Sequence, residues 1–248
     1  LGPGLLYAGA AIGVSHLVQS TKAGAKYGYI LIIAIVLAHI FKYPFFVLGP
    51  RYAKATNESL VKGYGRMGKW AVVLLLVLTI STMFTVQAAV TIVTAGLLQN
   101  MGLSFEPAII SLVLLLLCLA ILQVGKFSIL DNLMKVIMII LSASTVLAFV
   151  LSFTVDREII ESSKAVFDVN TEADLGFLLA FVGWMPAPLD IAIWHSIWTL
   201  AKGETNDKGE FDFKIGLYGT AFLGICFLVL GQFIFPLLRK AFRLISLN

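Results

Sequence analysis

Two apolar segments of the chain carry polar or metal-binding side chains near their middles. The first is "GAAIGVSHLVQ", with Gly13, Ser15 and His16, and the second is "GWMPAPLD", with Met185 and Asp190. A neutral imidazole can bind a metal ion or relay a proton, a thioether favours transition metals, and a carboxylate can bind a cation or accept a proton. We therefore expect one site for a metal ion or another small solute, with His16, Met185 and Asp190 as the candidate metal ligands.

Helix-breaking residues interrupt both segments. The first is expected to break at Gly13–His16 and the second at Met185–Pro188, where Pro186 belongs to the predicted site. Each half is about nine to twelve residues long, which is roughly half the thickness of a bilayer. Two broken spans at matching places in two repeats are typical of a transporter site, because the breaks free backbone groups for a ligand. The alternative is that glycine and proline only kink two helices.

Composition defines the class of protein. The chain has 248 residues, of which 59% are hydrophobic and 13% charged, and its mean hydropathy is +0.96. Soluble domains carry about 25% charged residues. The recurrent apolar runs are too long for barrel strands, so we expect an all-α integral membrane protein whose partner is the lipid bilayer. Neither nucleic-acid binding nor an enzymatic motif is indicated, and no cofactor is expected.

Seven apolar segments are interpreted as membrane spans of one transmembrane domain, residues 1–248. The segments cover residues 4–25, 29–48, 71–98, 107–124, 133–153, 175–200 and 215–235. The two broken segments are the first and the sixth. An offset of five spans indicates an inverted-repeat transporter fold.

Basic residues occur in alternate loops. The loops after the second, fourth and sixth segments include Arg51, Lys126 and Lys202, whereas the loop "QNMGLSFE" after the third has no lysine or arginine. The positive-inside rule places these basic loops, and with them the N-terminus, in the cytoplasm. The expected location is the bacterial inner membrane.

Other polar residues lie within the apolar segments. Gln87 and Thr91 are one helical turn apart and are candidates, with His195, for a polar or proton path; hydrogen bonding between helices is the alternative. Lys42 is expected to reach the cytoplasmic surface or to pair with a buried acid. Ser15 is expected to contribute a hydroxyl to the site or to cap the second half-helix.

Several of these stretches resemble the Nramp family of proton-coupled divalent-metal transporters. "GPGLLYAGAAIG" followed by "TKAGAKYGY" is similar to the family's first span, "DNLMKVIMII" to its fifth, and "GWMPAPLDIAIWHS" to its sixth. The resemblance extends from Gly2 to about Phe235. It implies a LeuT-like fold of ten or more spans, so that the last spans are absent from this chain, and it implies a divalent metal ion and protons as the transported species.

The departures from the family fall on functional positions. Gly13 stands where the family has its metal-binding aspartate, His16 where it has asparagine, and Gln87 where it often has an acid. Met185 and Pro186 match the family's methionine–proline pair, with alanine in place of the following histidine. A second register, anchored on "HS", would instead place Asp190 at that histidine.

The sequence is compatible with three functions. The first is a secondary transporter of divalent metal cations with a non-standard site at the two breaks. The second is a transporter of another solute, either a small organic molecule or a different cation, on the same fold. The third is a membrane sensor that transports nothing.

Overall fold

The computed structural model describes residues 3–13, 15–124, 127–154, 166–203 and 207–245, and these residues form helices and short connections without a β-strand. The elements in chain order are α1 (Pro3–Ala11), the π-helix η1 (Ser15–Ser20), α2 (Thr21–Tyr27), α3 (Ile32–Thr56), α4 (Leu60–Met67), α5 (Lys69–Asn100), α6 (Pro107–Val124), α7 (Phe127–Ser152), α8 (Glu172–Trp184), α9 (Ile191–Ala201) and α10 (Asp207–Ile245).

The helices lie where the apolar segments predict them. α6 has the predicted bounds of the fourth segment, and α5 and α7 contain most of the third and fifth. The first predicted segment is divided into α1, η1 and α2, and the sixth into α8 and α9. The all-helical fold is therefore confirmed, and both predicted interruptions are present.

Four helical stretches are long and apolar enough to cross a membrane: Ile32–Thr56, Lys69–Asn100, Ile129–Ser152 and Phe211–Phe233. α6 and α9 are shorter apolar helices. The large apolar side chains of α5 and α6 are mostly exposed, which lipid can accommodate but water cannot at this scale. These helices are those of an integral membrane protein.

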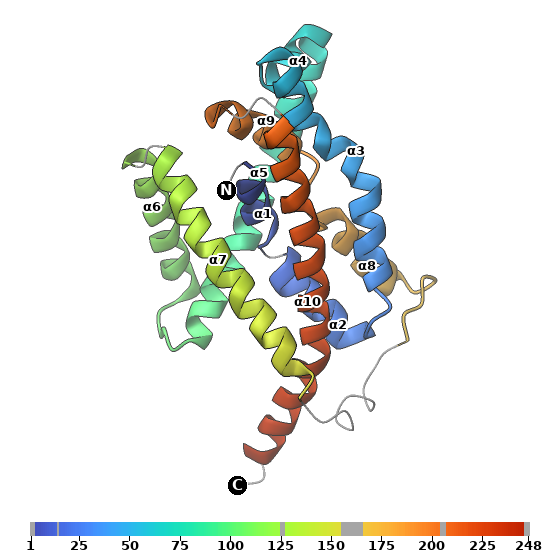
Figure 1. Ribbon diagram of the computed structural model, residues 1–248. Helices are drawn as coiled ribbons and strands as arrows, with labels where there is room; N and C mark the ends of the chain where they lie inside the picture. The colour runs from blue at the N-terminus through green and yellow to red at the C-terminus, as the bar shows by residue number, and fades with distance from the viewer. Residues whose placement is uncertain (1–2, 14, 125–126, 155–165, 204–206, 246–248) are drawn as a thin grey trace.

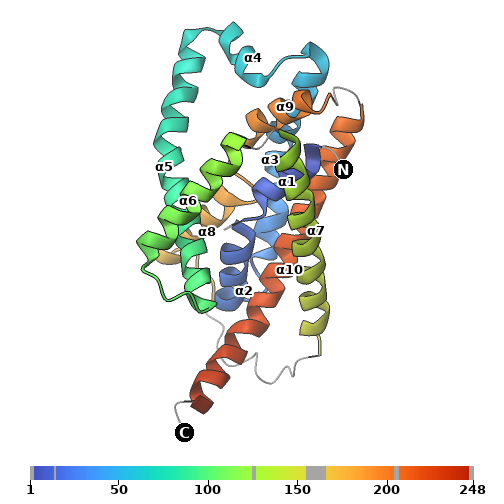
Figure 2. The same cartoon turned by 90° about the vertical axis from the view of Figure 1, so that its left-hand side faces the viewer.

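α10 runs through the middle of the helix bundle, beside the broken first segment (Figures 1 and 2). Glycines permit this close approach. A side chain on Gly216 would overlap the backbone of Gly4, one on Gly24 would overlap the backbone of Leu228, and one on Gly231 would overlap the backbone of α2. The two segments therefore contact each other through their backbones on both sides of the break in the first.

Ion pairs join elements at opposite ends of the bundle (Figure 1). At the end where α9 stops and α7 begins, the Asp131 carboxylate lies 2.6 Å from both the Lys135 and the Lys202 ammonium groups. At the other end, the Asp174 carboxylate on α8 lies 3.0 Å from the Lys26 ammonium on α2. The loop with Lys202 and the start of α8 therefore lie at opposite ends of the bundle.

Candidate functional site

The break in the first segment is shorter than predicted. α1 ends at Ala11, and the chain resumes a helical path at Ser15, so Ser15 and His16 belong to η1 and not to an unwound stretch. Gly13 is exposed, with open space where a side chain would stand. The Ser15 hydroxyl donates to the Ala11 carbonyl at 2.7 Å. Ser15 thus caps the end of α1, and not the second half-helix as the sequence suggested.

His16 is fully buried and bridges the break to α10. Its Nε2 lies 3.1 Å from the Thr220 carbonyl oxygen and donates to it, because a carbonyl only accepts. Its Nδ1 lies 2.8 Å from the Ser15 hydroxyl and 3.1 Å from the Ala11 carbonyl. Nδ1 of a neutral ring accepts only if the Ser15 hydroxyl turns from the Ala11 carbonyl toward the imidazole.

Thr220 connects His16 to a second histidine. While its carbonyl accepts from His16, its hydroxyl lies 3.2 Å from Nε2 of His39 on α3. The Nδ1 of His39 donates to the Ile35 carbonyl at 2.8 Å. Two imidazoles from the first and second predicted spans therefore meet at one threonine of the seventh. Thr220 is not among the predicted site residues. Its only indication in the sequence is a hydroxyl group within the apolar stretch "GLYGTAFLG".

The break in the sixth segment spans residues 185–190. Pro186 and Pro188 have no amide hydrogen, and a residue before proline is pushed out of helical conformation, so α8 ends at Trp184 and Met185 is extended. The peptide bond between Met185 and Pro186 is cis. α9 then begins at Ile191. This local chemistry is the reason that the break could be located from sequence.

Lys42 contacts the carbonyl groups that this break exposes. Its ammonium donates to the carbonyls of Val182 and Gly183 at 2.8 Å and to that of Ala187 at 3.2 Å. Among the described residues Lys42 forms no ion pair, so the expected pairing with a buried acid is wrong. These carbonyls lie at the C-terminal end of α8, where the helix dipole is negative and favours a cation, and the Val182 carbonyl also accepts from the Met185 amide at 3.3 Å.

The two breaks lie together in the fold. Ala11, at the end of α1, and Ala187, within the second break, belong to one buried apolar cluster. η1 contacts α8, and α1 contacts α9. On α3, His39 and Lys42 are one helical turn apart. His39 contacts Thr220, which also contacts His16 beside the first break, and Lys42 donates to the Ala187 carbonyl in the second break. One turn of α3 thus carries both polar contacts.

The candidate metal ligands have three different surroundings. His16 is hydrogen-bonded as described, whereas Met185 is fully buried in an apolar cluster with residues such as Ile35 and Leu228. Asp190 is exposed, and its carboxylate accepts from the Trp194 indole at 3.4 Å. Among the described residues, no group of three or more His, Cys, Asp or Glu side chains could hold a metal ion.

The predicted polar path does not reach the breaks. The Gln87 amide donates to the Thr91 hydroxyl at 3.1 Å, so this bond lies within α5 and does not join two helices. The α5 helix packs mainly against α4 and α6. His195 is fully buried among the rings of Tyr7 and Phe213, whose centroids lie 5.9 and 5.1 Å away. The structure thus places Gln87 and Thr91 on α5 and His195 among aromatic rings on α9.

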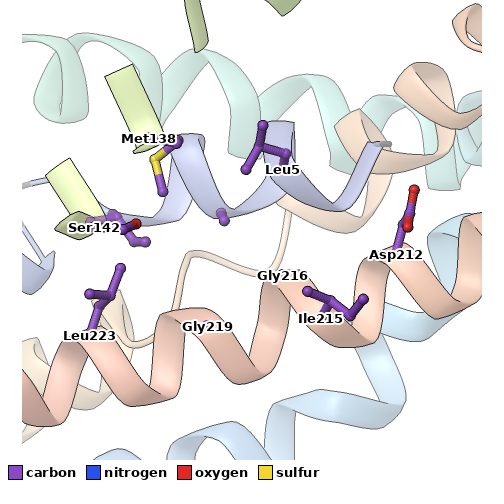
Figure 3. A pocket seen from close by; sticks show the side chains of 10 residues that line it. Leu5, Met138, Ser142, Asp212, Ile215, Gly216, Gly219 and Leu223 are labelled. Atoms are coloured by element: carbon purple, nitrogen blue, oxygen red, sulfur yellow. The ribbon is translucent and has the colours of Figure 1, made fainter. Parts of the chain in front are cut away.

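An apolar cavity lies between α1, α7 and α10, beside the first break (Figure 3). Its volume is about 190 Å³, and cavities that hold drug-sized ligands usually measure about 300–1,000 Å³. Leu5, Met138 and Leu223 contribute apolar walls, and Asp212 lies at one end. No residue of the predicted site lines this cavity, which is therefore distinct from the polar contacts at the breaks.

The fold and composition place the chain in the class of helical integral membrane proteins. No family model matches it, and no solved structure matches it. It is 37% identical over 243 residues to an uncharacterized protein of Pasteurella multocida, PM0681, and the match covers 94% of this chain and 56% of that protein. The chain thus spans little more than half of the length of this relative.

Proposed function

We propose that the chain is part of a secondary transporter whose solute site lies where the two broken segments meet. The observation that carries the proposal is the shared cluster of Ala11 and Ala187, which brings together two interruptions that are far apart in sequence. Broken helices supply unpaired backbone groups to a ligand, and rocking of such helices against a scaffold gives alternating access. The Nramp resemblance and a LeuT-like arrangement are consistent with this proposal.

The charges at the breaks favour a small organic solute over a divalent metal ion. The aspartate of the Nramp pattern is replaced by Gly13, which is exposed and leaves open space. The Lys42 ammonium already occupies carbonyls of the second break. A fixed positive charge repels a divalent cation and attracts a carboxylate, and the free amides of a broken helix can hold that carboxylate.

Divalent-metal transport remains the second candidate, because the family resemblance supports it. His16 is its strongest residue, since a buried imidazole is held at the first break. Of the two registers for the sixth segment, the burial of Met185 and the exposure of Asp190 support the one that aligns Met185 and Pro186 with the methionine–proline pair.

The test is uptake by the full-length protein in proteoliposomes. We expect saturable uptake of a small amino acid or carboxylate, reduced by about 5- to 150-fold in His16→Ala, because loss of one buried hydrogen-bonded group costs about 1–3 kcal/mol. Lys69→Ala, at an exposed lysine that begins α5, is the matched control and should retain uptake.

Two other results would decide against an organic solute. Uptake of Mn²⁺ that is lost in His16→Ala would establish the divalent-metal function. Folded protein that moves neither Mn²⁺ nor any organic solute in the panel would favour a membrane sensor.

A further inference from the structure

The second break contains a group of carbonyl oxygens that converge on one positive charge. The oxygens of Val182, Gly183 and Ala187 lie 2.8, 2.8 and 3.2 Å from the Lys42 nitrogen. Two come from the last turn of α8 and the third from the break itself, so they converge only because the helix is interrupted between them. Rings of backbone carbonyls are how proteins replace the hydration shell of a monovalent cation.

The charge of Lys42 is balanced by dipoles and not by an acid. In the part of the chain that the structure describes, no ion pair involves Lys42. The negative end of the α8 dipole points at the ammonium, because Val182 and Gly183 lie in the last turn of that helix. Carbonyl oxygens without a carboxylate suit a singly charged ion, whereas Ca²⁺ and Mg²⁺ sites usually include carboxylates.

We propose that the carbonyls of Val182, Gly183 and Ala187 form a monovalent cation site that the chain fills with its own Lys42. An ammonium group and K⁺ are similar in size, so K⁺ or NH₄⁺ should enter the same carbonyl set once the lysine is removed. The geometry of the second break then depends on a cation that is tethered to α3. Such a site does not require that the protein transport any solute.

The experiment compares thermal unfolding of the full-length protein and its Lys42→Met variant in detergent. Methionine keeps an unbranched apolar stem and removes the charge. In choline chloride, we expect Lys42→Met to unfold at a lower temperature than the wild type. Replacing choline by K⁺ or NH₄⁺ at equal ionic strength should raise that temperature by at least roughly 2 °C, in a saturable manner. The wild type should not respond, because its site is filled.

The control is Lys69→Met, which removes an exposed lysine on α5 and should behave as the wild type. If Lys42→Met does not fold, Lys42→Gln provides the second variant, because its amide can still donate to part of the carbonyl set. A smaller rise with K⁺ or NH₄⁺ is expected there than in Lys42→Met, because the amide occupies part of the carbonyl set. The proposal is overturned if the Lys42 variants respond equally to choline and K⁺, or if the wild type shows the same rise.

Discussion

At the scale of single residues, the polar contacts near the two breaks involve one turn of α3 and one threonine of α10. His39 contacts the Thr220 hydroxyl, and His16 contacts the Thr220 carbonyl. Lys42 contacts the carbonyls of the second break. Buried polar groups are costly unless they are hydrogen-bonded. These polar contacts within apolar helices therefore either stabilise the helix packing or form a functional site. Substitutions at Thr220 can remove its hydroxyl while its backbone carbonyl, the acceptor for His16, stays in place.

We predict that Thr220→Val lowers the free energy of unfolding by about 1 kcal/mol, because valine keeps the shape but lacks the hydroxyl that donates to the Leu217 carbonyl at 2.7 Å and lies 3.2 Å from His39. The measurement is thermal unfolding in detergent. Thr220→Ser is the matched control, since serine keeps the hydroxyl, and its stability should remain close to that of the wild type. Equal losses in the two variants would show that the hydroxyl contacts with Leu217 and His39 add little.

At the scale of helices, the positions of α1, α2 and α10 depend on glycines that lie between them. A side chain on Gly24 would overlap the backbone of Leu228. Gly96 on α5, in contrast, has open space around the position of a Cβ atom. The two glycines therefore have different roles, although both are helical: the first allows two backbones to touch, and the second only lowers the intrinsic helix propensity.

We predict opposite effects for alanine at these two positions. Gly24→Ala should lower the free energy of unfolding by about 1–3 kcal/mol, because the overlap forces α2 away from α10. Gly96→Ala should leave it unchanged or raise it by up to about 1 kcal/mol, since alanine is the better helix former. Thermal unfolding of both variants tests this contrast. A Gly24→Ala protein as stable as the wild type would contradict the close packing of α2 and α10.

The ends of α2 and α8 are joined by a carboxylate outside the predicted spans. Hydrogen bonds from the Tyr27 hydroxyl and the Lys26 ammonium hold the pKa of Asp174 below its ordinary value of 3.8. A carboxylate whose pKa is depressed in the folded state stabilises the protein above its unfolded-state pKa. That contribution is lost as the pH falls through the lower folded-state value.

We therefore predict that acidification below about pH 3.8 destabilises the wild type more than Asp174→Asn, which has no proton to gain. The measurement is the unfolding temperature of both proteins as a function of pH. Glu106→Gln, which changes an exposed acid at the start of α6, is the control and should follow the wild-type curve. Parallel curves for wild type and Asp174→Asn would refute the role of this carboxylate.

At the scale of the whole molecule, the helix directions alternate, so the connections lie at two opposite ends (Figures 1 and 2). α4 and the Asp131–Lys202 pair lie at one end, and the start of α8 lies at the other. The predicted basic loops gather at the first end. Alternation of this kind is what a membrane requires, and the positive-inside rule adds an orientation to it.

We predict that a cysteine at position 62, on α4, is labelled by a membrane-impermeant thiol reagent only from the cytoplasmic side. A cysteine at position 170, just before α8, should be labelled only from the opposite side. The background would have Cys118 and Cys226 replaced. Labelling in intact cells and in inverted membrane vesicles distinguishes the two sides. The reverse pattern would place the N-terminus outside the cytoplasm.

The sequence by itself determined the class of protein, the helix positions and the two interruptions. These features follow from local properties: apolar length, and the inability of proline or glycine to continue a helix stably. It also identified His16 and Ser15 as residues beside the first break, although it placed the unwound stretch too far along the chain.

Only the tertiary structure decided which groups meet. Lys42 reaches carbonyls some 140 residues away in sequence, and His16 reaches a threonine 204 residues away. Such contacts depend on how helices rotate and pack, which no local pattern encodes. Because helix packing is not encoded locally, the sequence predicted Met185 and Asp190 as metal ligands together with His16. Both residues lie near the second break, as predicted, but Met185 is buried in an apolar cluster and Asp190 is exposed.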